Sequence, residues 1–82
     1  MNCYQLIEFL EALPSTGMIE IERKGGGEFY IVASTASYEA VGEDAIKITA
    51  ELGYGAFATI PSVVLLVCEE VSFIRHSAGS KA

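Results

Sequence analysis

Positive charge is scarce in this chain of 82 residues. Five lysines and arginines stand against eleven aspartates and glutamates, which gives a net charge of −6. Only Arg23 and Lys24 are adjacent, and Glu20, Glu22 and Glu28 surround them. Nucleic-acid binding depends first on basic contacts to phosphates, and anionic membranes attract basic segments. The sequence therefore predicts no nucleic-acid partner and no membrane partner.

A long hydrophobic run is also missing. The most apolar stretch, residues 60–68, is far shorter than the roughly 20 residues that a membrane span needs. No basic residue precedes Arg23, and Glu8 and Glu11 interrupt the apolar N-terminal segment, so this segment does not have the pattern of a signal peptide. These features predict a cytoplasmic protein in a reducing compartment.

Cysteine and histidine are too few for a metal centre or a disulfide scaffold. The chain has two cysteines, Cys3 and Cys68, and one histidine, His76. Small secreted domains usually have four or more cysteines, so we expect two free thiols, with Cys68 as a small buried hydrophobe. His76 is expected at the exposed end of a strand. We therefore predict no metal, no other cofactor and no catalytic residue.

Paired carboxylates are the remaining candidates for chemistry. They are Glu20 with Glu22, Glu39 with Glu43, and Glu69 with Glu70. General acid–base catalysis needs a sheltered carboxyl group whose pKa is shifted toward neutrality. The sequence gives no sign of shelter for any of the pairs, so solvated surface faces are the simpler interpretation.

What the chain has in abundance is apolar residues. Apolar residues make up 51% of it, and the mean hydropathy is +0.40, which excludes a disordered chain. A chain of this size forms one thin-cored domain. We predict a single α+β domain over residues 1–76. The small, polar residues 77–82 are expected to form a flexible C-terminal tail.

The N-terminal segment has the apolar spacing of an amphipathic helix. Leu6, Phe9, Leu10 and Leu13 recur at helical intervals, and Asn2 is a suitable N-cap. The next residue after Leu13 is a proline, which ends a helix. The spacing predicts a helix over residues 2–13.

A β-hairpin is predicted over residues 18–34. Ile19 and Ile21 alternate with glutamates, three glycines follow, and a segment rich in aromatic and β-branched residues comes next. The glycines lead into a strand rather than a helix, which indicates a turn and not a phosphate loop. Two registers remain open, with Ile21 opposite either Tyr30 or Ile31. The first strand is expected nearer the edge of the sheet.

The segment 37–52 has the spacing of a second amphipathic helix. Its apolar residues fall at steps of three and four, and they are Tyr38, Val41, Ala45, Ile48 and Leu52. Gly42 within this segment disfavours a helix by about 1 kcal/mol relative to alanine. The alternative is a strand over residues 45–50, because Ile46, Ile48 and Thr49 favour sheets.

The C-terminal third of the chain has the residue pattern of β-strands. We expect a short strand over residues 56–60, broken by Pro61, and a strand buried on both faces over residues 62–68. Glu69 and Glu70 then form either a bulge or a loose turn before an alternating segment, 71–75. The predicted fold class is a two-layer α+β sandwich in the order α-β-β-α-β-β, with a mainly antiparallel sheet and two helices.

Two helices cannot easily cover both faces of such a sheet, so the sequence predicts association. We expect a homodimer or a higher homo-oligomer, with a non-enzymatic role in protein–protein interaction. The predicted interface residues are Val63, Val64, Leu65, Leu66, Val67, Val71 and Phe73, and which alternating set faces outward is left open. One alternative is a small-molecule-binding protein with an apolar pocket between the second helix and the sheet, lined by Tyr30, Tyr38 and Tyr54. Another is a subunit whose site forms at an oligomer interface.

Overall fold

The computed structural model describes residues 2–53 and 58–77 and contains, in this part of the chain, one α-helix and six strands. The elements are α1 (Cys3–Ala12), β1 (Met18–Arg23), β2 (Glu28–Val32), η1 (Ala33–Thr35), β3 (Ser37–Val41), β4 (Ala45–Gly53), β5 (Ile60–Val67), η2 (Cys68–Glu70) and β6 (Val71–Ser77). Both η1 and η2 are single 3-10 turns. The fold is thus rich in β-structure.

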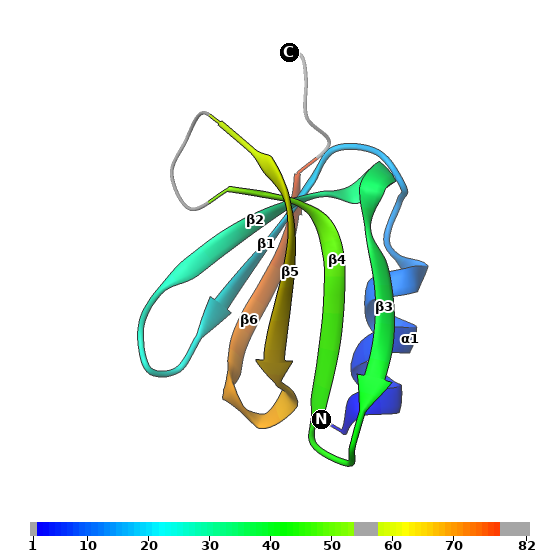
Figure 1. Cartoon of the computed structure of the whole chain (residues 1–82), viewed down its shortest axis with the longest axis vertical. Coiled ribbons are helices and arrows are strands. Elements are labelled where there is room, and N and C mark those ends of the chain that lie inside the picture. Colours follow the sequence, from blue (N-terminus) through cyan, green and yellow to red (C-terminus); the bar gives the residue numbers. More distant parts are fainter. Residues whose placement is uncertain (1, 54–57, 78–82) are drawn as a thin grey trace.

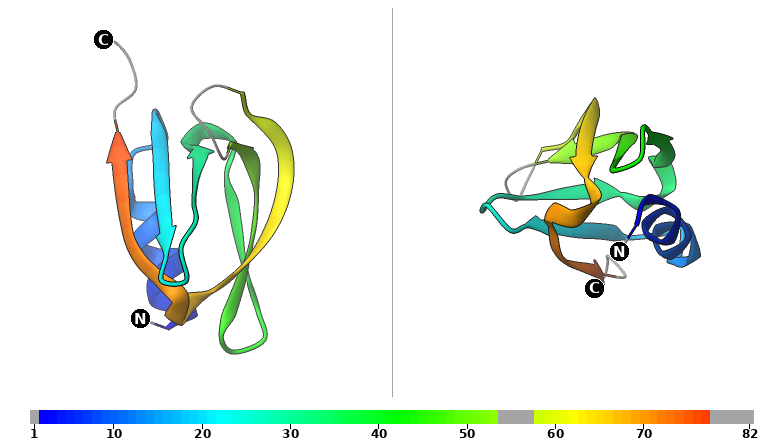
Figure 2. Two further views of the ribbon diagram at one scale, coloured as in Figure 1. Left: turned by 90° about the vertical axis from the view of Figure 1, so that its left-hand side faces the viewer. Right: turned by 90° about the horizontal axis from the view of Figure 1, so that it is seen from below.

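The six strands form one antiparallel sheet that bends into two facing halves (Figures 1 and 2). One half consists of β6, β1 and β2, and the other consists of β3, β4 and β5. Strand β4 joins them, because residues 45–49 pair with β3 while Leu52 and Gly53 pair with Ile31 and Tyr30 of β2. Strand β5 pairs with the other side of β4 over residues 45–52.

The turn η1 lets β2 and β3 follow each other along the same side of β4. Thr35 in this turn donates its hydroxyl hydrogen to the carbonyl of Val32 at 2.7 Å. The same hydroxyl oxygen accepts a hydrogen bond from the backbone N–H of Glu51 at 2.9 Å. A side chain thus replaces a ladder hydrogen bond where the chain passes from one half of the sheet to the other.

The predicted N-terminal helix is confirmed as α1. Asn2 is its N-cap: the side chain of Asn2 accepts from the N–H of Gln5 at 2.8 Å, and the Gln5 side chain accepts in return from the N–H of Asn2 at 3.1 Å. This capping box satisfies two backbone groups at the start of the helix. Leu6 and Leu10 are buried, but Phe9 of the predicted apolar stripe is 43% exposed.

The predicted β1–β2 hairpin is also confirmed, in a register that differs from both alternatives. Ile21 lies opposite Phe29, and Ile19 lies opposite Ile31. All four side chains are buried and form cross-strand pairs on the inward face. The pattern could not fix this register because residues 29–32 are all apolar, so every nearby register gives Ile21 an apolar partner.

Strand β1 lies nearer the edge of the sheet than β2, as expected, although it is not itself an edge strand. It pairs with β2 on one side and with β6 on the other. The sequence pattern shows which residues of a strand are buried on one face, but it does not show how many neighbours the strand has. The partner β6 is supplied by the far end of the chain.

The prediction of a second helix over residues 37–52 is wrong. This segment forms the hairpin β3–β4, so the α-β-β-α-β-β sandwich is replaced by a β-rich fold with one helix. The strands are separated by the turn at residues 42–44, where Gly42 has a φ of +68°. That left-handed conformation favours glycine and is not helical. The alternative prediction, a strand over residues 45–50, matches the structure.

Two periodicities overlap in this segment, which explains the error. Tyr38, Ile48 and Leu52 fit the spacing of a helix, but they also fit an alternation that places even-numbered residues on the inward face. Ile46 and Ile48 are fully buried, and Thr49 is exposed. Alternating burial with β-branched side chains is the pattern of a half-buried strand.

The strand predicted to be buried on both faces is β5, and it is buried on one face only. Strand β5 starts at Ile60 and includes Pro61, so the proline does not separate two strands there. Proline is tolerated at the edge of a sheet, and β5 pairs with β4 alone among the described strands. The rest of the predicted short strand, at residues 56–57, lies outside the described residues.

Glu69 and Glu70 form the loose turn that was one of the two alternatives. They lie in η2, where the N–H of Cys68 donates to the carbonyl of Asp44 at 2.8 Å, and the N–H of Lys24 donates to the carbonyl of Glu70 at 2.7 Å. The turn redirects the chain from β5 to β6. Ser77 ends β6, and residues 78–82 of the predicted tail lie outside the described residues.

The space between α1 and the two halves of the sheet is filled by one hydrophobic core. Helix α1, strands β1, β2, β4 and β5 and the turn η2 all contribute to it. Its buried members are Cys3, Leu6, Leu10, Ile19, Ile21, Phe29, Ile31, Ile46, Ile48, Ala50, Leu52, Leu66 and Cys68. The core leaves the outward faces of both halves to solvent or to a partner.

Candidate functional site

Three exposed apolar side chains line the outward face of β5. Val63, Leu65 and Val67 are 60%, 61% and 39% exposed, and we call them the β5 strip. The alternating residues Val64 and Leu66 pack into the core. Of the two alternating sets predicted for the interface, the structure therefore turns the set Val63, Leu65 and Val67 outward.

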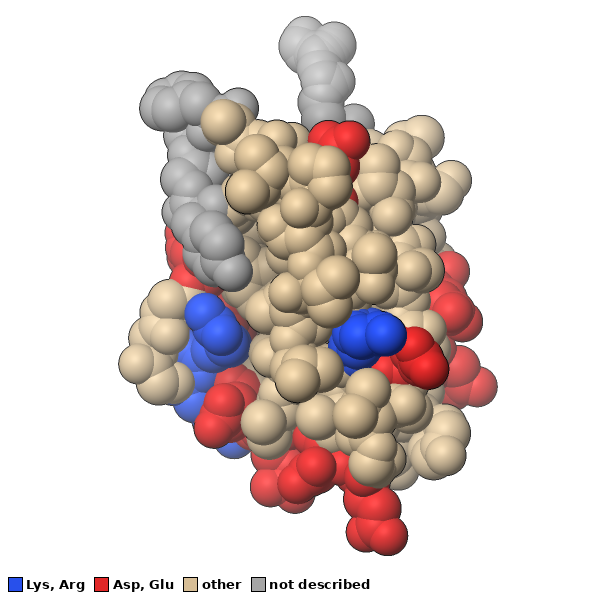
Figure 3. Space-filling model, in the orientation of Figure 1, with Lys and Arg blue, Asp and Glu red and all other residues tan. Residues whose placement is uncertain are grey.

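Polar side chains border the β5 strip on the same outward face. Leu65 lies opposite Lys47 of β4, which lies opposite Glu39 of β3, and Lys47 Nζ is 3.4 Å from Glu39 Oε1. Val63 lies opposite the exposed Thr49. Figure 3 shows a broad uncharged area on this side of the molecule, with both acidic and basic side chains at its border. The β5 strip is thus an apolar patch with a polar border.

Both β5 and β6 present an open strand edge. Strand β5 pairs with β4 and strand β6 pairs with β1, and the described residues supply no second neighbour for either. The third edge strand, β3, lies beside α1 (Figure 1). Unpaired N–H and C=O groups along an edge are a template for pairing with another strand. The β5 strip therefore lies next to a backbone that can pair.

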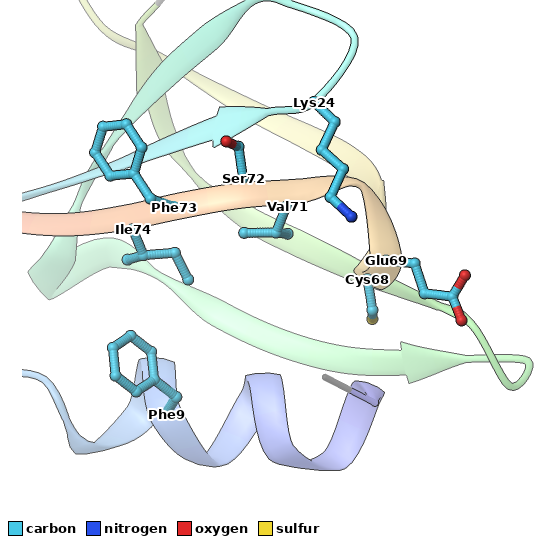
Figure 4. Close-up of a pocket in the computed structure, with 8 residues that line it drawn as sticks. All are labelled: Phe9, Lys24, Cys68, Glu69, Val71, Ser72, Phe73 and Ile74. Atoms are coloured by element: carbon cyan, nitrogen blue, oxygen red, sulfur yellow. The ribbon is translucent and has the colours of Figure 1, made fainter.

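A groove with a volume of about 240 Å³ lies between α1 and the edge of β6 (Figure 4). Phe9 of α1 and the side chains of Val71 and Ile74 of β6 point toward each other, whereas Ser72 and Phe73 point to the other side of β6. Phe9 and Phe73 are 43% and 42% exposed. Apolar groups therefore flank the β6 edge on both sides. The sequence placed Phe9 in the core and did not indicate this groove.

On the outward face of the other half of the sheet, two polar side chains pair with each other near the exposed Phe73. Glu20 is only 7% exposed although it lies on this face, and Arg75 donates from Nη2 and Nε to Glu20 Oε1 at 2.6 and 3.1 Å. The hydrogen bond to this carboxylate raises the pKa of Arg75. The prediction that Glu20 is solvated is wrong, because Arg75 covers it. The covering residue comes from a strand that only the β1–β6 pairing brings there.

The predicted tyrosine pocket has lost its basis. The second helix that would have formed one wall is absent, and Tyr54 lies outside the described residues. Tyr30 lies opposite Glu20 on the outward face and donates its hydroxyl hydrogen to Glu28 Oε2 at 3.0 Å, a bond that raises the pKa of Tyr30. Tyr38 lies opposite a buried residue of β4, beside an open cavity of about 290 Å³ near the end of α1. The two tyrosines therefore point to different sides of the sheet.

The two cysteines meet in the core. Their Sγ atoms are 2.7 Å apart, and the Cys3 Sγ also lies 3.3 Å from the carbonyl oxygen of Ala45. Both are free thiols and buried, as predicted for Cys68. Burial, and then the hydrogen bond with Cys3, raises the pKa of Cys68 to about 12. A thiol of this kind is a poor nucleophile while it stays buried. Nothing in the sequence indicated that the two residues touch.

His76 lies on β6, with Nε2 at 2.7 Å from the carbonyl oxygen of Thr16. Within residues 2–53 and 58–77, no group of three or more His, Cys, Asp or Glu side chains is placed to hold a metal ion. The same part of the chain contains no helix with the length and hydropathy that crossing a membrane requires. The sequence-based expectation of a protein without metal or cofactor stays a prediction.

The chain was also compared with known proteins. Protein-family models, curated proteins and solved structures give no match to it. The function is therefore inferred from the exposed surfaces of the structure.

Proposed function

We propose that this chain is a small self-associating interaction module of the cytoplasm, without enzymatic activity of its own. Copies meet through the β5 strip and the open edges of β5 and β6. The observation that carries the proposal is the coincidence of three exposed apolar side chains with an unpaired strand edge on β5. Single exposed apolar residues are common on monomers, but an apolar edge strand is a liability unless something covers it.

The two open edges are chemically compatible with each other. When two strands pair edge to edge, their outward side chains become cross-strand neighbours. The β5 strip of one copy would then meet Phe73 on the β6 of the next. Apolar groups thus face apolar groups on the outward side of the new pairing.

The assembly size depends on which edges pair. Pairing of β5 with β5 around a twofold axis gives a homodimer, whereas pairing of β5 with β6 uses two different surfaces and gives a ring or a filament. The net charge of −6 argues against nucleic acid as the partner, because the few basic residues form no stripe. Another acidic copy is tolerated because the contact surface itself is apolar and the acidic groups lie at its rim.

Light scattering coupled to size-exclusion chromatography tests the proposal. We expect a multiple of the 8.8 kDa chain mass at tens of micromolar protein. The variant Leu65→Lys should reduce the mass to that of one chain, because a charge at the centre of the β5 strip opposes edge pairing. The matched control is Tyr4→Lys, which puts the same charge at a 76% exposed aromatic residue of α1 and should leave the assembly intact.

A wild-type chain that is folded by circular dichroism and elutes as a single copy at this concentration would overturn the proposal. So would an assembly that withstands Leu65→Lys but dissociates with Tyr4→Lys, because that result would place the interface on α1. A wild-type assembly that Leu65→Lys breaks, with folding retained, supports it.

A further inference from the structure

Cys3 and Cys68 are the two cysteines of the chain, and the fold brings them together from positions 65 residues apart. Cys3 is the first residue of α1, and Cys68 is the first residue of η2, between β5 and β6. Their side chains are 2% and 4% exposed, and their Sγ atoms are 2.7 Å apart. A disulfide joins sulfur atoms about 2.05 Å apart, so less than about 1 Å of movement separates the thiols from a bond.

Each cysteine is held in place by its own backbone contacts. The capping box between Asn2 and Gln5 fixes the start of α1 on either side of Cys3. The N–H of Cys68 donates to the carbonyl of Asp44, in the turn that precedes β4. The two sulfur atoms therefore meet because two separately anchored segments place them there.

We propose that Cys3 and Cys68 are a dithiol–disulfide modification site, at which a low-molecular-weight disulfide such as oxidised glutathione converts the two thiols into an intramolecular disulfide. One cysteine thiolate attacks the oxidant, forms a mixed disulfide and releases one reduced thiol. The second cysteine thiolate then attacks the cysteine sulfur of the mixed disulfide and releases the other. The cysteines lose two protons and two electrons, and one molecule of oxidant becomes two thiols.

Burial controls the rate of this modification. The oxidant cannot reach sulfur atoms that are at most 4% exposed, and the raised pKa of Cys68, about 12, keeps its thiolate scarce in the closed state. The first exchange therefore requires the start of α1 to separate from η2. When α1 returns, the second thiol is already beside the mixed disulfide, so ring closure is faster than escape of the intermediate.

The disulfide would tie α1 to the turn from which both open edge strands lead away. Helix α1 forms one wall of the groove along β6 through Phe9, and η2 joins β5 to β6. In the dithiol form only noncovalent contacts hold α1 there. In the disulfide form a covalent ring spans the chain from α1 to η2, which restricts the unfolded state and raises stability.

The test is to incubate the whole folded chain with oxidised glutathione and to measure the intact mass without reductant. We expect a loss of two hydrogen masses and no glutathione adduct. A peptide that joins Cys3 to Cys68 should appear after proteolysis. The melting temperature should rise by roughly 10 °C, and dithiothreitol should reverse the rise. Addition of urea below the unfolding transition should accelerate the modification, because it populates the opened helix.

Variants keep the test decisive. Cys3→Ala leaves a good helix former in α1, and this variant should stop at a glutathione adduct on Cys68 with no rise in melting temperature. Thiols that can still be fully alkylated in denaturant after the incubation would overturn the proposal, as would stable adducts or intermolecular disulfides in the wild-type chain. Because the mass and the peptide map need only the wild-type chain, they decide the matter even if Cys3→Ala does not fold.

Discussion

The outward faces of the two halves of the sheet differ in which side chains they carry and in whether those side chains have partners. On β6, β1 and β2 two pairs of outward polar side chains are hydrogen-bonded: Arg75 covers Glu20, and Tyr30 donates to Glu28. On β5 the outward side chains are the apolar Val63, Leu65 and Val67, at an open edge. Both faces belong to one small sheet, yet Glu20 and Tyr30 have side-chain partners within their half, whereas the apolar side chains of β5 remain exposed.

The difference shows that the exposure of a side chain on a strand depends on the side chains and elements that lie next to it in space. A carboxylate on an outward strand face becomes almost fully buried when an arginine from the next strand lies over it. An apolar strand is half exposed when no helix of the described residues covers its outward face. The inward faces are alike in both halves, so the outward faces determine what each half can contact.

The largest expected effect contrasts two adjacent leucines of β5. Leu66→Ala should lower the free energy of unfolding by about 2–5 kcal/mol, because Leu66 is 1% exposed and its loss leaves a cavity. Leu65→Ala is the control at a 61% exposed position of the same strand. Its effect should weaken on dilution, because it acts through association rather than through the core. Urea titrations at several protein concentrations separate the two, and equal, concentration-independent losses would mean that β5 is not split into an inward and an outward face.

A smaller effect is expected from breaking the paired face. Arg75→Ala should lower the urea midpoint, because it removes two charge-assisted hydrogen bonds, at 2.6 and 3.1 Å, to Glu20, whose side chain is 9% exposed with Arg75 in place. The control is Lys47→Ala, which breaks an ion pair with Glu39 whose two side chains are 42% and 67% exposed. Exposed pairs contribute little, so this variant should unfold close to wild type. A larger loss for Lys47→Ala would contradict the contrast between the two faces.

The sequence predicted the elements whose signals are local. Helix α1 has an N-cap, an apolar stripe and a proline after it, and the β1–β2 hairpin has alternation on both sides of a glycine turn. Each of these signals acts within a few residues of the element, so tertiary contacts did not have to be known. The hairpin register was missed because residues 29–32 offer an apolar partner to Ile21 in every nearby alignment.

The candidate site was partly predictable for the same reason. The apolar character of β5 and its alternation are local, so the two sets of interface residues could be named, but the outward set is decided by the pairing with β4. The contact between Cys3 and Cys68, the cover of Glu20 by Arg75 and the groove beside Phe9 all join distant segments. No pattern along one segment indicates such contacts.

Substitution of Gly42 tests the largest difference between the predicted and the observed fold, which is the β3–β4 hairpin in place of a second helix. In the turn between β3 and β4 its φ is +68°, so Gly42→Ala should lower the free energy of unfolding by about 1 kcal/mol or more. In a helix the same change would raise stability by about 1 kcal/mol, so the sign of the effect distinguishes the two structures. The control is Gly25→Ala, at a glycine without positive φ and with no atom within 4 Å of the added Cβ. It should be close to neutral in the same urea titration.

The smallest expected effect concerns the hydrogen bond between Tyr30 and Glu28 on the paired face. The phenol donates to a carboxylate, so loss of its proton places two negative charges together, and the pKa of Tyr30 rises above 10.0 in the folded chain. Because the folded pKa is raised, the bond's contribution to stability is fully present below pH 10.0 and is lost as the pH rises through the folded pKa. Tyr30→Phe should therefore be slightly less stable than wild type at neutral pH, and this difference should shrink above pH 10.0. Thermal melts across that range provide the measurement, with Tyr4→Phe on α1 as the matched control. A wild-type advantage over Tyr30→Phe that grows as the pH rises would contradict the hydrogen bond and remove one of the two pairs that distinguish this face from β5.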